Sequence, residues 1–322
     1  MKKYNESATY QKKHGQVKNS LMAVGVSEEQ AEIMADCMAC ADVFGVTSHG
    51  CVMLEAHINR IQNGGYNLNP QIKVERNTGA FAVIDGDNAL GPVSASYCIN
   101  YGIEMCKESG VFTVFAKNNN TFGPAFYYSL KAAEQGYIAF ICSNSPAQMA
   151  PMGGKDKLLG TNPFAIVIPV PNENPIIIDM ATSVVAKSKF KEYMIEGKEL
   201  PQGWALDENG NPTTDPSEAI KGLILPMSGF KGYAISMLID IISGVLSGAA
   251  YLNKVGRFYS EDASSMNVGF YISVIDPKQV LGNDYDELIK EYVSAVRASA
   301  PQSGKRIALP GDDRNNHKDT LK

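Results

Sequence analysis

The chain has 322 residues and a mass of 34.8 kDa, with 44% apolar and 20% charged residues. These values exclude long-range disorder and fit one large α/β unit, or two to three subdomains that share a core. The formal net charge of −5 comes from 29 basic and 34 acidic side chains and provides no basic footprint, so we expect no nucleic-acid partner.

Helical and β-rich patterns alternate along the chain. The first helix is predicted to begin at the Ser27 capping box, which Gln30 completes, and to end at Asp42. A second helix follows the sequence 47–50 and runs to about Gln62. Further strands are predicted over 80–84, 111–116, 137–142, 164–170, 176–180 and 268–275, and helices over 93–108, 125–135, 184–196, 233–246 and 284–299.

The connections predict an α/β fold with a mixed sheet. The turn over 169–175 is too short for a parallel crossover, so the strands on its two sides are expected to be antiparallel. The longest apolar run, 233–250, contains Asp240 and several small or hydroxyl residues, and is predicted to be a buried core helix. We therefore expect no membrane span, and the polar start predicts no secretory signal and a cytoplasmic location. The charged tail over 311–322 is expected to fray.

Cysteine and histidine spacing predicts no metal site. The six cysteines lie in apolar segments and are expected to be reduced structural thiols, including the Cys37-x-x-Cys40 pair within a helical pattern. Four histidines form no cluster with them at ligand spacing. His57 is expected on the surface. His49, between Ser48 and Gly50, is either a proton donor near neutral pH or a capping or surface residue.

The sequence lacks the common nucleotide-binding motifs, since it contains neither Gly-x-Gly nor a Walker loop. It has instead several loops rich in glycine, asparagine and hydroxyl residues, at 143–146, 153–154, 160–163, 179–183 and 228–233. Such loops offer backbone N–H groups and hydroxyls to a polyanion, although each is also typical of an ordinary turn. Lys231 adds a positive charge at the start of a predicted helix.

These loops resemble those of the malate/L-lactate dehydrogenase family, which includes sulfolactate, ureidoglycolate, 2,3-diketogulonate and piperideine-2-carboxylate dehydrogenases or reductases. The resemblance covers about residue 10 to Gly311 and rests on 41–50 (ADVFGVTSHG), 159–163 (LGTNP), 179–183 (DMATS), 212–216 (PTTDP) and 229–233 (GFKGY). It implies a sulfolactate-dehydrogenase-like fold with a non-Rossmann nicotinamide-nucleotide domain, and a homodimeric oxidoreductase that acts on CH–OH groups with NAD or NADP.

The resemblance also implies roles for particular residues. His49 matches the proton-transferring histidine of the family, and the substrate would lie against Ser48, Met53, Asn120 and Thr121. Cofactor contacts fall on Ser145, Thr161, Asn162, Asp179, Met180, Ala181, Lys231, Gly232, Lys305 and Arg306. The implied division is an N-terminal helical segment over 1–70, a substrate and dimerisation subdomain over 71–118 and 280–322, and an NAD(P)-binding subdomain over 119–279.

Two departures affect the substrate half of the site. The family usually has an arginine four residues after the histidine, where this chain has Met53, which cannot pair with a carboxylate. Many members have a second histidine where the segment 118–123 (NNNTFG) has Thr121, which cannot act as a base near neutral pH.

Three hypotheses follow from these departures. The chain is an oxidoreductase for a small 2-hydroxy or 2-oxo acid, a related carbonyl or a cyclic imine, with Lys117, Arg60 or a residue of the second subunit replacing the missing cation. Alternatively, it is a nucleotide-binding pseudoenzyme or regulatory subunit. In the third hypothesis the nucleotide loops mislead, and the protein is a binding module for another ligand.

Overall fold

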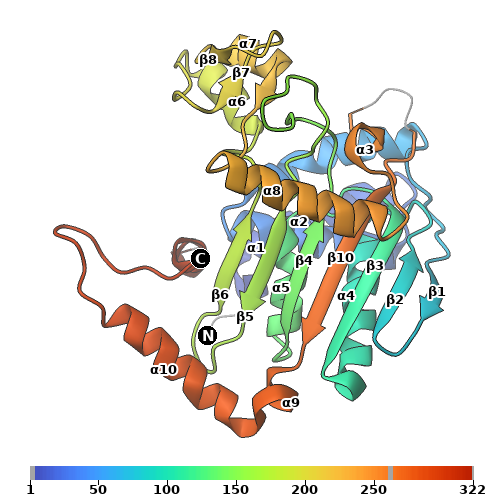
Figure 1. The fold of residues 1–322 in the computed structure, drawn as a ribbon. Coiled ribbons are helices and arrows are strands. Elements are labelled where there is room, and N and C mark those ends of the chain that lie inside the picture. The colour runs from blue at the N-terminus through green and yellow to red at the C-terminus, as the bar shows by residue number, and fades with distance from the viewer. Residues whose placement is uncertain (1–3, 260–263, 321–322) are drawn as a thin grey trace.

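Seven strands form one mixed sheet in the order β1-β2-β3-β10-β4-β5-β6 (Figure 1). The computed structural model describes residues 4–259 and 264–320. Strands β2 and β3 are parallel, and the other neighbouring pairs are antiparallel, including β5 and β6 as predicted. The strand bounds are β1 Lys73–Asn77, β2 Phe81–Asp85, β3 Val111–Asn119, β4 Ile138–Ser143, β5 Phe164–Ile168, β6 Ile176–Met180 and β10 Val268–Ile275.

Helices cover one face of this sheet in successive layers. Helices α4 (Gly91–Ser109) and α5 (Ala125–Ala133) pack directly on the strands, α2 (Glu28–Val43) packs on them, and α1 (Ala8–Met22) packs on α2. Strand residues that face these helices alternate with partly exposed neighbours and are fully buried, as Val114 and Ile272 show. Burial of their apolar surface supplies the main stabilisation of this layer. Short 3₁₀ helices are η1 (Tyr4–Glu6), η2 (Thr47–His49), η3 (Cys51–Met53), η5 (Leu252–Lys254) and η6 (Gly282–Asp284).

Helix α2 begins where the sequence predicts, because the Ser27 side chain accepts a hydrogen bond from the Gln30 N–H. The second predicted helix is also confirmed as η3 followed by α3 (Leu54–Gln62). All six cysteines are free, and Cys37 and Cys40 are buried within α2. Their surroundings raise the pKa of the Cys40 thiol, chiefly through burial and then through Asp36, so both residues are packing thiols.

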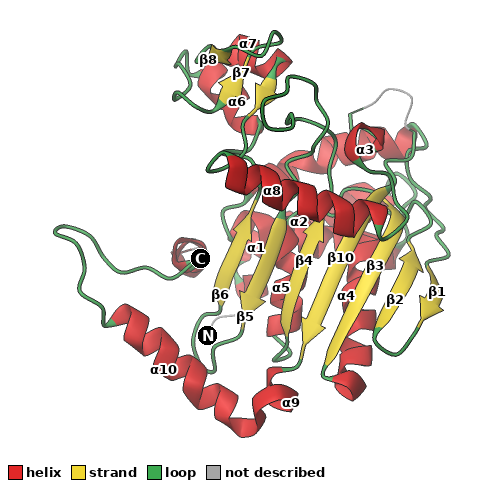
Figure 2. Ribbon diagram, in the orientation of Figure 1, coloured by secondary structure: helices red, strands yellow, loops and turns green. Residues whose placement is uncertain are grey.

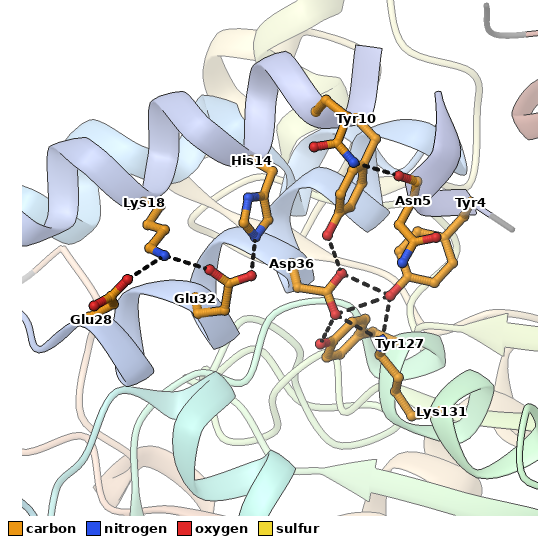
Figure 3. Close-up of polar contacts among 11 residues, drawn as sticks. Tyr4, Asn5, Tyr10, His14, Lys18, Glu28, Glu32, Asp36, Tyr127 and Lys131 are labelled. Atoms are coloured by element: carbon orange, nitrogen blue, oxygen red, sulfur yellow. Dashed lines mark hydrogen bonds and ion pairs between the residues drawn. The ribbon is translucent and has the colours of Figure 1, made fainter. Parts of the chain in front are cut away.

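The N-terminal segment is fastened to the helical layers by Asp36 of α2 (Figure 3). The carboxylate accepts hydrogen bonds from the hydroxyls of Tyr4, Tyr10 and Tyr127, at 2.6 to 3.0 Å, and pairs with the Lys131 ammonium at 2.8 Å. Burial alone would raise the pKa of Asp36, but Lys131 and the hydroxyls hold that pKa below its ordinary value. The network ties η1 and α1 to α2 and α5.

A small unit projects beyond the sheet (Figure 2). It contains β7 (Ala205–Leu206), β8 (Pro212–Thr213), β9 (Leu223–Ile224), α6 (Ser188–Ile195) and α7 (Pro216–Lys221). Its own core includes Phe190, Leu200 and Ala219. The sequence predicts its first helix but not its strands, because two-residue strands are too short to show alternation.

The predicted buried core helix at 233–250 is wrong in its burial. Helix α8 (Phe230–Ile239) continues as the π-helical turn η4 (Asp240–Val245), and Phe230, Leu238 and Ile241 are exposed. The side that contacts the sheet buries small and polar residues, among them Ser236, Asp240 and Ser243, whereas the opposite, apolar side faces solvent. The described residues contain no helix that is long and apolar enough to cross a membrane.

The C-terminal tail is a docked helix, contrary to the expectation that it frays. After α9 (Pro277–Leu281) and the predicted α10 (Tyr285–Arg297), the chain returns to the sheet as α11 (Asp312–Thr320) (Figure 1). Asn315 and Lys318 are buried there. Tertiary contacts stabilise a sequence whose composition alone does not favour order.

The seven-stranded sheet runs across the predicted boundary between residues 118 and 119. Strand β3 ends at Asn119 and pairs with β10, which also pairs with β4. The division into substrate and cofactor subdomains therefore stays a prediction that this sheet does not mark.

Candidate active site

The Ser-His-Gly loop is shaped by a buried carboxylate at the end of α2. Asp42 accepts a hydrogen bond from the Cys51 N–H at 3.2 Å and pairs with Lys13 of α1 at 2.6 Å. A Cβ atom at Gly50 would lie 1.9 Å from Asp42 Oδ1, so the loop closes over this carboxylate only with glycine at that position. Sequence analysis missed the role of Asp42, although Asp42 lies within the motif that carries the family resemblance.

His49 lies at the solvent-facing end of η2. Its Nδ1 is 3.0 Å from the Ser48 hydroxyl, and no described residue forms a hydrogen bond with Nε2. Desolvation by the surrounding chain is the largest cause that lowers the pKa of His49; Arg314 lowers it further, whereas Asp179 opposes the shift. Neither η2 nor η3 has a side-chain capping hydrogen bond, which argues against the capping alternative. His49 is exposed, and its role as proton donor stays a prediction beside that of a surface residue.

The loops predicted to hold a cofactor are joined by hydrogen bonds. The Ser145 N–H donates to Asn162 Oδ1 at 3.1 Å, and the hydroxyls of Ser145 and Thr161 are 3.5 Å apart. Asn162 is fully buried, and its amide also donates to the Ser236 hydroxyl and carbonyl of α8. Asn162 therefore positions the loops, while Ser145 and Thr161 are partly accessible.

The DMATS loop joins the same assembly. Both the hydroxyl and the N–H of Thr182 donate to the Thr161 carbonyl at 2.9 Å, and the Thr182 carbonyl accepts from the Met227 N–H. Gly232 is buried against Met227, where a Cβ atom would lie 2.2 Å from the Met227 carbonyl oxygen. Lys231 is exposed in the first turn of α8. Hydrogen bonds therefore link the loops at 145, 160–162, 179–182 and 227–236.

Arg314 of α11 contacts the linked loops, and sequence analysis missed it. Its guanidinium pairs with the Asp179 carboxylate at 2.5 Å and donates to the Asp179 carbonyl at 3.2 Å. Sequence analysis did not predict this contact because it expected the tail to fray, and the local sequence contains no pattern that predicts a docked helix there.

Lys305 and Arg306 are not brought to these loops within the chain. Both are exposed, and Arg306 pairs with Asp313 at 2.8 Å beside the turn at 172–174. That turn precedes β6, whereas Asp179 lies near the end of β6. Their predicted cofactor role stays a prediction.

The substrate half contains the two replaced positions. The Tyr259 hydroxyl donates to Met53 Sδ at 3.5 Å, so the position of the family arginine presents a thioether beside a phenol. Thr121 is partly exposed, while Asn120 is buried, with its amide donating to Asn88 Oδ1 and the Ala89 carbonyl.

The two cations proposed from the sequence already have partners. Arg60 is buried and donates to the Ser264 carbonyl at 2.6 Å and to Asn120 Oδ1 at 3.3 Å, while Lys117 pairs with Glu75 at 2.8 Å. The expected surface position of His57 is wrong, because its ring is buried and its Nδ1 lies 2.8 Å from the Tyr66 hydroxyl. Burial and then Arg60 lower the pKa of His57 to about 4. The rings of Tyr66 and Phe258 pack against His57, and the polar sequence neighbours of His57 did not predict these contacts.

The described part of the chain contains no group of three or more His, Cys, Asp or Glu side chains that could hold a metal ion.

Comparison with known proteins identifies the family. Residues 8–322 match the model of the malate/L-lactate dehydrogenase family. A malate dehydrogenase from Pyrococcus horikoshii is 39% identical, over 87% of this chain and 79% of the relative. An NAD⁺-dependent ureidoglycolate dehydrogenase from Escherichia coli is 32% identical, over 94% of this chain and 86% of the relative. The structure of sulfolactate dehydrogenase from Methanocaldococcus jannaschii superposes with a TM-score of 0.90 at 35% identity, over 96% of this chain and 90% of that one. The chain belongs to the malate/L-lactate dehydrogenase family and is an oxidoreductase of the sulfolactate-dehydrogenase fold.

Proposed function

We propose that this protein transfers a hydride between NAD or NADP and a small 2-hydroxy or 2-oxo acid, or a related carbonyl or cyclic imine, with His49 as proton donor. The observation that carries the proposal is the set of hydrogen bonds that joins the loops at 145, 160–162, 179–182 and 236 into one assembly. Helix α11 links this assembly to the segment before His49, because Arg314 pairs with Asp179 and His317 Nδ1 lies 3.0 Å from the Val43 carbonyl oxygen.

The residues present fit an anionic dinucleotide. A Cβ atom at Gly160 would lie 2.2 Å from the Ser145 carbonyl oxygen, so the backbone of the two loops packs closely without a side chain between them. Lys231 and the first turn of α8 offer positive charge, and the hydroxyls of Ser145 and Thr161 offer hydrogen bonds. These residues, with Asp179, Met180 and Ala181, would hold the cofactor, whose nicotinamide supplies or accepts the hydride when bound.

His49 would transfer the proton. The Ser48 hydroxyl at Nδ1 leaves Nε2 open toward the substrate, so a protonated ring can give its proton to the carbonyl oxygen or imine nitrogen as the adjacent carbon is reduced. In the oxidation direction, the neutral ring takes the proton from the hydroxyl. The lowered pKa of His49 favours the neutral ring near neutral pH, so the protonated ring, once formed, gives up its proton readily. Thr121, which is partly exposed, would polarise the substrate oxygen as a neutral donor.

The substrate is expected to be larger or less acidic than malate or lactate. Neither Met53 nor Tyr259 carries a positive charge, and loss of a charge-assisted contact costs about 2 kcal/mol or more of anion binding. A 2-oxo acid would bind well only if its carboxylate meets a cation elsewhere.

We further infer that the enzyme is a homodimer. The sheet face opposite α4 and α5 bears a row of partly exposed aromatic rings from five strands: Phe81, Phe115, Tyr271, Phe140 and Phe164. Neighbouring rings in this row are 5.3 to 6.1 Å apart. With the exposed apolar side of α8, this surface is larger than single scattered residues explain and fits a second copy.

The first test is a titration with NADH and then NADPH, following energy transfer from Trp204, on protein whose mass in solution is measured. Binding of either cofactor followed by turnover of a 2-oxo acid, ketone or cyclic imine supports the proposal. Binding without turnover across these classes would favour the nucleotide-binding pseudoenzyme. Binding of neither cofactor would refute both.

The second test is His49→Ala, with His14→Ala as the matched control. His14 lies on α1 and pairs with Glu32 at 2.9 Å, away from the linked loops. We expect His49→Ala to abolish turnover with little change in cofactor Kd, and His14→Ala to keep both. Full activity of His49→Ala would show that the histidine is structural.

A further inference from the structure

The C-terminal helix α11 is attached along the edge strand of the sheet. The Ile177 N–H of β6 donates to the Pro310 carbonyl at 2.9 Å, and Asn315 donates to the Pro175 carbonyl at 3.1 Å. A Cβ atom at Gly311 would lie 2.7 Å from Ile177 Cβ, so the chain enters α11 in close contact with β6. These contacts fix the start of α11 to the strand that ends in the DMATS loop.

The same helix also contacts the segment that leads into the Ser-His-Gly loop. His317 Nδ1 lies 3.0 Å from the Val43 carbonyl oxygen. A Cβ atom added to Gly45 would lie 3.5 Å from the nearest atoms of the His317 ring, so the ring packs against this glycine. The Lys318 ammonium lies 5.8 Å from the Phe44 ring centre. Helix α11 therefore bridges the proton-donor loop and the strand that carries Asp179.

Arg314 connects this bridge with the site. Its guanidinium contacts the carboxylate and the carbonyl of Asp179, and lies 5.2 Å from the ring centre of Phe126. The Arg314 side chain is 26% exposed and that of Asp179 is 11% exposed. The pair is thus shielded from solvent more than a typical surface ion pair. Two hydrogen bonds to Asp179 and the contact with the Phe126 ring hold the Arg314 guanidinium in one orientation.

We propose that Arg314 is a positioning residue of the active site, which holds the Asp179 carboxylate in place and couples the C-terminal helix to proton transfer at His49. The inference rests on the proposed function. The titratable and charged groups that act on His49 are Asp179 of β6 and Arg314 of α11, and His57 of α3 also interacts with it. The Ser48 hydroxyl completes the polar surroundings of the ring.

Removal of the guanidinium changes the proton affinity of His49 in a defined direction. Arg314 disfavours the protonated ring, and an unpaired Asp179 carboxylate favours it. Arg314→Gln therefore raises the pKa of His49. If the protonated ring drives reduction, the alkaline fall of kcat/KM for reduction moves to higher pH. The acid limb for oxidation, which needs the neutral ring, moves the same way.

The test compares pH profiles of kcat/KM in both directions for wild type, Arg314→Gln and Arg314→Lys. We expect both limbs of Arg314→Gln to move up by about half a pH unit or more, with a loss of kcat. Arg314→Lys keeps the charge but not the fork geometry, so its profile should stay near that of wild type while kcat falls. Unmoved limbs in Arg314→Gln would overturn the proposal.

Arg297→Gln is the matched control for simple loosening of the tail. Arg297 pairs with Asp312 at the start of α11, at 3.0 Å, but does not contact Asp179. An equal shift of the pH profile in Arg297→Gln would assign the effect to docking of the helix and overturn the role of Arg314. If Arg314→Gln fails to fold, a profile of Arg314→Lys displaced as far as half a pH unit overturns the proposal. Wild-type protein that binds no cofactor refutes the proposed function instead.

Discussion

Gly50→Ala probes how the Ser-His-Gly loop is held. The added methyl would lie 1.9 Å from Asp42 Oδ1 and 2.5 Å from Asp42 Cγ, far inside van der Waals contact. Because Asp42 is only 7% exposed, its carboxylate cannot simply swing into solvent. Either the carboxylate or the loop must move, and in both cases the bond to the Cys51 N–H is strained or lost.

The cost follows from the contacts involved. Loss of a charge-assisted hydrogen bond to a buried carboxylate costs about 1.5–3 kcal/mol, and the half-exposed Lys13 contributes at most about 1 kcal/mol. We expect a loss of about 2–4 kcal/mol in the free energy of unfolding, which lowers Tm by roughly 4–8 °C. A displacement of the loop by about 1 Å would lower kcat by about 10²-fold, while the cofactor Kd stays within about twofold because the linked loops are elsewhere.

The assay combines urea unfolding, kcat and NADH binding, and the matched control is Gly15→Ala. Gly15 lies inside α1 with nothing within 4 Å of its added Cβ, so alanine there should stabilise the protein by about 0.5–1 kcal/mol and leave kcat unchanged. A Gly50→Ala protein with the stability and kcat of wild type would refute the reasoning, because the loop would then tolerate the clash without consequence.

Two further predictions concern charge. The pKa of His57 is about 4 in the folded protein, against about 6.5 in the unfolded chain. His57 therefore stabilises the fold above pH 6.5, and this contribution is lost as the pH falls toward 4. Urea unfolding from pH 7 to 4 should show a smaller decline in the free energy of unfolding for His57→Gln than for wild type, and equal declines would contradict the assignment. Lys231→Ala should raise the cofactor Kd by about fivefold or more, through loss of a charge-assisted contact. Its Tm should not change, because Lys231 is exposed. The control Lys198→Ala, which removes an exposed lysine of the small unit, should leave Kd unchanged, and an unchanged Kd in Lys231→Ala would show that Lys231 is not part of the site.

The elements that sequence analysis predicted correctly are those with strong local signals. The capping box at Ser27 determines the start of α2, and the short turn at 169–175 predicts an antiparallel β5–β6 pair, which the structure confirms. The linked loops were likewise recognisable because their residue types are unusual for a protein interior. Local chemistry was sufficient in each of these cases.

The missed features depend on contacts between distant residues. Asp42 organises a loop eight residues later, Arg314 reaches a carboxylate 135 residues away, and His57 is buried by Tyr66 and Phe258. Helix α11 has a polar composition without a periodic apolar pattern, so its sequence does not predict that it packs on the sheet. Such positions become visible only when the fold brings the partners together.

The distribution of charge around the site bears on the two replaced positions. Lys117, Arg60 and Arg314 all have partners, in Glu75, in the Asn120 amide and the Ser264 carbonyl, and in Asp179. A substrate carboxylate would have to displace one of these contacts, which costs free energy that binding to an unpaired arginine would not. The Ser-His-Gly loop and the linked loops, in contrast, keep the residues that the proposed chemistry requires. Met53, with Tyr259 beside it, therefore fits a change in the polarity of the substrate better than a loss of catalysis, since a pseudoenzyme has no need to retain both His49 and the close packing of Gly50 over Asp42.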